Sequence, residues 1–154
     1  MTKTSLAILA GVLTLAAAAP AHAQGVGPYS FYTLAPCRVI DTRNPNGPLG
    51  GPALAANAAR SFPVLGVCNL PADATAAAIV ATVVDETDFG DLRLFPAGST
   101  LPLASTINFA VNHAKANNAI VPLGTFGAIS VQCDMPPAST GTTNFLFDVF
   151  GYFK

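Results

Sequence analysis

Asn144-Phe-Leu-Phe-Asp-Val-Phe-Gly-Tyr152, near the end of the chain, is the stretch that decides the fold class. Side chains alternate between the two faces of an extended strand. One face therefore receives Phe145, Phe147 and Val149, and the other receives Leu146, Asp148, Phe150 and Tyr152. Both faces are mostly apolar, which is typical of a central strand of a β-sandwich. We expect one face to lie in the core and the other to be covered by a loop or a neighbouring molecule.

Other short runs rich in Val, Ile, Phe, Thr and Leu are separated by Gly, Pro, Asn and Asp, the pattern of strands joined by turns. These runs are Phe31–Leu34, Arg38–Asp41, Arg60–Leu65, Ala76–Asp85, Leu92–Phe95, Ser105–Ala110, Ala116–Leu123 and Ala128–Cys133. Because Phe31–Leu34 is short, we expect about eight strands in all. Long loops are expected at Asn44–Asn57, which is rich in Pro and Gly, and at Met135–Thr143. The sequence therefore predicts an all-β fold, an antiparallel β-sandwich of jelly-roll-like type.

The run Ala72–Ala81 is the segment with the most helical character, because Ala has the highest helix propensity. Its continuation to Val84 is β-branched, and β-branched side chains fit a pleated surface better. We therefore expect one turn near Pro71–Ala74 and then a strand.

The first residues, Met1–Ala23, have the features of a secretory signal peptide. Lys3 precedes an uncharged run rich in Leu and Ala, and a small-x-small triplet ends at Ala23. The apolar run is shorter than the roughly 20 residues that cross a bilayer. We expect cleavage after Ala23, export, and a single β-sandwich domain over residues 24–154, long enough to bury a core of its own.

Few side chains of this protein carry charge. The 154 residues are 51% hydrophobic and 10% charged, with a formal net charge of -1. A general nucleic-acid binder needs a basic surplus to neutralise phosphates, and this chain has none. No transmembrane segment is expected once the signal peptide has been removed.

The three cysteines of an exported protein allow three single bridges. We favour Cys37–Cys68, because this bridge closes the Pro- and Gly-rich loop and would stabilise the fold by about 3 to 4 kcal/mol. Cys133 is then a buried thiol or an intermolecular link. A catalytic thiol would need a base, for which His113 is the one imidazole after Ala23. A zinc site would need closer Cys-x2-Cys spacing.

Two separated motifs point to a family. They are Cys37-Arg-Val-Ile-Asp-Thr-Arg43 and Asp148-Val-Phe-Gly-Tyr-Phe153, with Gly47-Pro-Leu49, Cys68-Asn-Leu-Pro71 and Asn117-Asn-Ala119 between them. The series resembles a widespread group of secreted bacterial β-domains that begin near Cys-Arg-x-x-Asp-Thr-Arg and end in Asp-x-x-Gly-Tyr-Phe. Such domains occur alone or attached to extracellular hydrolases. The resemblance covers Tyr32–Phe153 and implies a fold class and a compartment, but no chemistry.

Arg43 and Asp148 are the ion pair that we expect within the fold. Asp148 interrupts an apolar strand, where a buried carboxylate needs a partner, and Arg43 alternates with Asp41 along another strand. A pair between Arg43 and Asp148 would join the two ends of the domain. The competing interpretation makes Asp41 and Asp148 a catalytic carboxylate pair around a cleft, as in glycoside hydrolysis.

The densest acidic cluster comprises Asp85, Glu86, Asp88 and Asp91, in an expected turn between two strands. Carboxylates are preferred ligands of Ca²⁺, so these four residues are the candidate calcium ligands. They lack the order of an EF-hand loop, and a solvated hairpin tip needs no ion. No cofactor is expected.

Two functions from different classes remain. The first is a secreted, non-enzymatic module of the extracellular space, cell surface or periplasm that binds a cell-envelope component, an extracellular polymer or itself. It predicts a contiguous exposed apolar surface. The alternative is a small secreted hydrolase, in which two of Asp41, Asp85, Asp91 and Asp148 converge in a pocket and at least one has a perturbed pKa.

Overall fold

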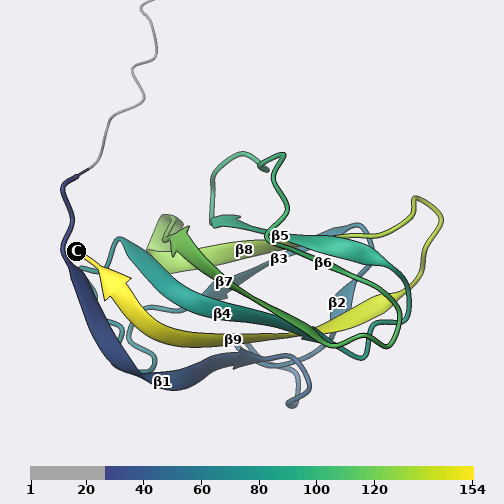
Figure 1. Ribbon diagram of the computed structural model, residues 1–154, viewed down its shortest axis with the longest axis horizontal. Coiled ribbons are helices and arrows are strands. Elements are labelled where there is room, and N and C mark those ends of the chain that lie inside the picture. Colours follow the sequence, from purple (N-terminus) through teal and green to yellow (C-terminus); the bar gives the residue numbers. More distant parts are fainter. Residues whose placement is uncertain (1–26) are drawn as a thin grey trace, which may run out of the picture.

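The computed structural model describes residues 27–154, which form two antiparallel sheets packed face to face (Figure 1). The expected signal peptide, Met1–Ala23, and residues 24–26 lie outside the described residues. Within residues 27–154 the strands are β1 (Phe31–Asp41), β2 (Leu54–Ala55), β3 (Ala58–Pro63), β4 (Ala76–Val84), β5 (Gly90–Pro96), β6 (Ile107–Phe109), β7 (Lys115–Pro122), β8 (Ala128–Asp134) and β9 (Thr142–Phe153). A 3-10 turn, η1 (Thr125–Gly127), precedes β8. The predicted all-β sandwich is confirmed.

The strand singled out by the sequence, β9, lies inside the larger sheet. That sheet has the order β1-β9-β4-β7, and β2 pairs with the first residues of β9. The second sheet has the order β3-β8-β5-β6. Figure 1 shows β1, β9, β4 and β7 as one layer and β3, β5 and β8 behind it. The prediction of a central strand for β9 is confirmed.

Aromatic side chains fill the space between the sheets. Phe145 and Phe147 of β9 and Phe62 of β3 are fully buried, and the rings of Phe62 and Phe145 lie 6.0 Å apart. Val149 continues the same face, as the alternation predicts. Opposite Ala78–Ile79 a β-bulge inserts an extra residue into β9. The bulge reverses the alternation beyond it, so Tyr152 packs against the core, contrary to the prediction.

Most strand positions agree with the sequence, with two differences. The expected strands Phe31–Leu34 and Arg38–Asp41 are parts of one long strand, β1, which is interrupted by bulges. The expected loop Asn44–Asn57 contains the short strand β2. The Ala-rich run enters a strand at Ala76, as expected. Within residues 27–154, no helix has the length and apolar character needed to cross a membrane.

Candidate functional site

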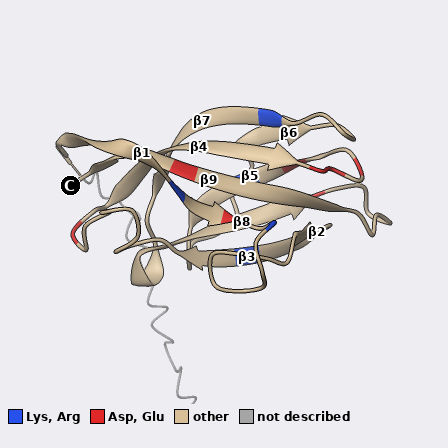
Figure 2. Ribbon diagram, turned by 90° about the horizontal axis from the view of Figure 1, so that it is seen from below, with Lys and Arg blue, Asp and Glu red and all other residues tan. Residues whose placement is uncertain are grey.

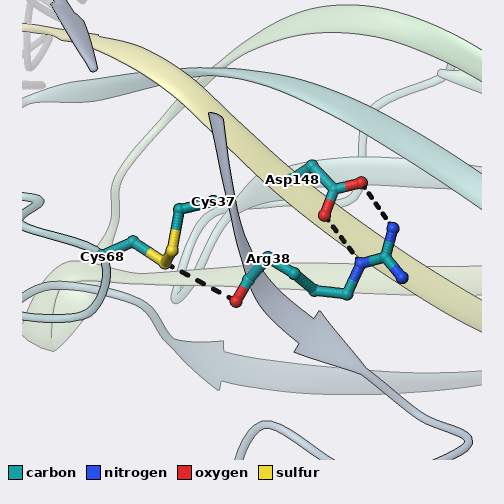
Figure 3. The surroundings of a disulfide bond; sticks show 4 residues. All are labelled: Cys37, Arg38, Cys68 and Asp148. Carbon is teal, nitrogen blue, oxygen red and sulfur yellow. Dashed lines mark hydrogen bonds and ion pairs between the residues drawn. A yellow bond between two sulfur atoms is a disulfide. The ribbon is translucent and has the colours of Figure 1, made fainter. Parts of the chain in front are cut away.

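A disulfide joins Cys37 of β1 to Cys68, in the connection between β3 and β4 (Figure 3). The two Cα atoms lie 5.8 Å apart, which is within the usual range for a disulfide. The predicted pairing is confirmed. Cys133 is a buried free thiol, and burial raises its pKa to about 12. A thiol with so high a pKa is protonated at neutral pH and is a poor nucleophile.

Asp148 binds Arg38, not the predicted Arg43. The two residues are direct partners in the β1–β9 pairing. Arg38 donates from Nε to Asp148 Oδ1 at 2.7 Å and from Nη2 to Oδ2 at 2.9 Å (Figure 3). Arg43 lies beyond the last residue of β1, and its guanidinium binds Asp41 instead. The pair with Asp148 is also not buried, because the Arg38 side chain is 45% exposed.

Asp41 is held in its ionised form. It accepts hydrogen bonds from the backbone N–H and the guanidinium of Arg43, and Arg38 Nη1 lies 3.6 Å from its Oδ2. The hydrogen bonds from Arg43 lower the pKa of Asp41 to about 2, although burial opposes this shift. Asp41 and Asp148 thus share Arg38 as a counter-ion, and neither lines the hollows described below. The arrangement fits structural ion pairs.

The four candidate calcium ligands do not converge. Asp85 accepts a hydrogen bond from Asn144, and Asp88 accepts one from Ser139. Across residues 27–154, no group of three or more His, Cys, Asp or Glu side chains is placed to hold a metal ion. Carboxylates that lie close together in the sequence therefore do not form a metal site in the folded domain.

Glu86 is buried rather than solvated. Its exposed fraction is 1%, and neither carboxylate oxygen has a hydrogen-bond partner. It lines a hollow of about 370 Å³ together with Arg43, Asp85 and Asn112. The sequence placed Glu86 in an exposed hairpin tip, and no local pattern marks it as buried. A carboxylate in this setting is costly to keep inside the protein.

Two carboxylates do meet at another shallow hollow, of about 360 Å³, at one end of the two inner strands of the second sheet. Asp91 of β5 is the direct partner of Asp134 of β8, and both line the hollow with Phe89 and Met135. Burial and then the charge of Asp134 raise the pKa of Asp91. Arg93 binds Asp134, with 2.6 Å between Nη2 and Oδ2. One carboxylate is thus neutralised by a guanidinium, and the other has a raised pKa.

An apolar groove of about 680 Å³ lies at the end of the sandwich where β9 finishes. It forms where the start of β4, the ends of β7 and β9, and the turns around η1 come together. Its lining carries no charged side chain: Tyr29, Leu65, Ala74, Thr75, Ala76, Ile120, Pro122, Leu123, Gly124, Gly127 and Phe153. These residues come from widely separated segments, so no local pattern in the sequence predicts the groove.

Two exposed apolar side chains belong to the segments that form this groove. Ile120 is 62% exposed on the outer edge of β7. Phe126 is 93% exposed and sits between two lining residues, Gly124 and Gly127. Together with the uncharged lining they extend the apolar surface at this end of the sandwich, which makes it a candidate contact surface.

The C-terminal motif contributes Phe153 to the lining of the groove. Phe153 packs against Phe31, with ring centroids 5.1 Å apart, and Tyr152 stacks on Tyr32 at 5.2 Å. A side chain on Gly151 would collide with the Phe31 ring, so the glycine of the motif makes room for this packing. Gly151, Tyr152 and Phe153 therefore have a structural role in packing β9 against β1.

Charged side chains lie mainly away from the groove. Figure 2 shows Lys, Arg, Asp and Glu as isolated segments on a largely uncharged ribbon. Lys154 and Asp73, the chain neighbours of the lining residues Phe153 and Ala74, form an ion pair, with 3.2 Å between Nζ and Oδ2. Lys154 Nζ also lies 5.2 Å above the Tyr32 ring. The lining of the groove itself is thus uncharged.

No protein-family model matches the chain, and the search of curated proteins found no match.

Proposed function

We propose that this protein is a secreted, non-enzymatic binding module that adheres to a cell-envelope component or an extracellular polymer through its apolar groove. The groove with its exposed apolar rim is the observation that carries the proposal. A hollow of a few hundred Å³ with an apolar lining and few polar groups has the character of a ligand site. The ligand chemistry that fits is an uncharged, apolar group, such as an acyl chain or an apolar substituent of a polymer.

The disulfide supports a location outside the cytosol. Bridges of this kind form and persist outside the cytosol, in the extracellular space or the periplasm. This agrees with the signal peptide expected from the sequence and with the resemblance to secreted β-domains. The scarcity of charge supports an apolar partner in place of a nucleic acid.

Retention of the oxidised protein on purified envelope and on insoluble extracellular polymers tests the proposal. Ala76→Glu puts a carboxylate into the groove and should abolish retention, because the apolar ligand would have to desolvate a charge. Ala58→Glu is the matched control, since Ala58 is exposed at the far end of β3. Retention that survives Ala76→Glu, or no retention on any of these materials, would refute the role of the groove.

A second candidate function rests on the hollow between Asp91 and Asp134. A carboxyl group with a raised pKa directly opposite a second carboxyl group in one hollow is a pairing that acid–base hydrolysis uses. A small secreted hydrolase would use Asp91 as the acid. The test is a hydrolase screen of the wild-type protein against Asp91→Asn and Asp134→Asn, in which loss of an activity in both variants would support this function.

A further inference from the structure

We infer that two copies of this chain associate by pairing their β7 strands edge to edge, which joins their larger sheets into one. This inference goes beyond the groove and its ligand, because it concerns a partner for the backbone of an edge strand. It rests on four features of the described residues: the open edge of β7, the protection of the other edges, the fit of β7 to itself, and the placement of charge.

β7 is a long, regular strand with one free side. Its eight residues pair with β4 without a register shift, from Ala76 opposite Pro122 to Val83 opposite Lys115. β7 lies at the end of the sheet order, so alternate residues direct their N–H and C=O groups away from β4. Among residues 27–154, no backbone or side-chain group outside the sheet bonds to these groups. A row of unpaired backbone groups of this length is a template for another strand.

The other edges of the two sheets are blunted. β1 is broken by two bulges and contains Pro36. β3 is bordered by a loop whose carbonyl oxygens, at Gly47, Gly51 and Pro52, accept hydrogen bonds from Arg60. β6 has only three residues. Bulges, prolines and short strands are the usual protection of an edge, and β7 has none of them over residues 116–121, although the Asn117 side chain donates a hydrogen bond to the Thr106 carbonyl beside the strand.

β7 fits a second copy of itself. Two identical strands pair antiparallel about a two-fold axis perpendicular to the sheet, which gives a closed, self-complementary contact. A register centred on Asn118 leaves Pro122, which has no N–H, beyond the paired segment. In this register Asn118 faces Asn118 of the second copy, and Ile120 lies beside Ala116 of the second copy. The pairing therefore covers Ile120, which is 62% exposed in the single chain.

The charge on β7 is compatible with this register. Lys115 is the one charged residue of the strand and stands at its start. It falls opposite Val121 of the second copy, and the two Lys115 side chains are about 20 Å apart along the paired strands. No like charges face each other. An edge contact of this length is smaller than a standard interface of roughly 1,600 Å², so the dimer is expected to be weak and concentration-dependent.

Sedimentation velocity over a series of protein concentrations tests the inference. The wild-type protein should shift from monomer toward dimer as its concentration rises. Asn118→Lys places two like charges opposite each other and should raise the dissociation constant about tenfold or more. Asn108→Lys on β6 is the matched control, because Asn108 is also an exposed edge residue, and it should dimerise like the wild type.

Disulfide trapping provides a second readout that does not depend on the charge variant folding well. Asn118→Cys should form a covalent dimer under mild oxidation, whereas Asn108→Cys should not, and the buried Cys133 should not react. A wild-type protein that stays monomeric throughout, or equal cross-linking of the two variants, would overturn the inference. The proposed groove function is judged separately, because Ala76→Glu on β4 should abolish retention on envelope or polymer and should leave the sedimentation series like that of the wild type.

Discussion

Replacing Cys37 and Cys68 together by Ala should lower the free energy of unfolding by about 3 to 4 kcal/mol. The bridge closes a segment with a sequence separation of 31 residues, and the loss of loop-closure entropy in the unfolded chain scales with the logarithm of that length. For a domain of this size, the same loss corresponds to a fall in Tm of roughly 10 to 15 °C. The folded state should survive, because the core between the sheets does not depend on the bridge.

Urea unfolding, followed by circular dichroism and intrinsic Tyr fluorescence, measures this difference. The wild-type protein in reductant is the matched comparison, because reduction opens the same bridge without changing a side chain. Both samples should lose a similar free energy, and Cys133 should remain inaccessible to thiol reagents until unfolding. A loss below about 1 kcal/mol in both samples would refute the account of the bridge as a constraint on the unfolded chain.

Three further predictions concern the ionisable groups. The pKa of Asp41 is about 2 in the folded protein, against 3.8 for the free side chain. Its contribution to the free energy of unfolding, at most about 2 kcal/mol, is therefore present above pH 4 and is lost as the pH falls toward 2. Urea unfolding across this pH range should show the loss, and Asp41→Asn should abolish this part of the pH dependence. A double-mutant cycle should give a coupling of about 0.5 to 1 kcal/mol between Arg38 and Asp148 and none between Arg43 and Asp148. Glu86→Met should raise the free energy of unfolding by about 1 to 3 kcal/mol, because it removes a buried carboxylate without a partner, and a loss of stability would contradict this.

The strands could be predicted because their signal is local. Alternation in β9 and the Gly and Pro residues between strands gave the architecture and most strand positions. The disulfide was also within reach, because only three pairings were available and one closed a long loop. The face on which Tyr152 lies was predicted wrongly, because a bulge reverses the alternation of side chains along a strand and the sequence does not reveal a bulge.

The site was harder to predict because it depends on which segments meet. Arg43 was assigned to Asp148 on the assumption that β1 extends through Arg43, but β1 ends at Asp41 and its register brings Arg38 to Asp148. The apolar groove combines residues from Tyr29 to Phe153, and none of its segments is unusual alone. The burial of Glu86 could not be predicted either, since a charged residue between two strands normally lies in water.

Equilibrium titration of the protein with a fluorescent fatty acid, below its micelle concentration, tests the central claim most directly. The account predicts saturable binding of one probe per chain to the wild-type protein and to Ala58→Glu, and a loss of affinity of about tenfold or more in Ala76→Glu. Binding that is absent, does not saturate, or is unchanged in Ala76→Glu would contradict the assignment of the groove as the binding surface.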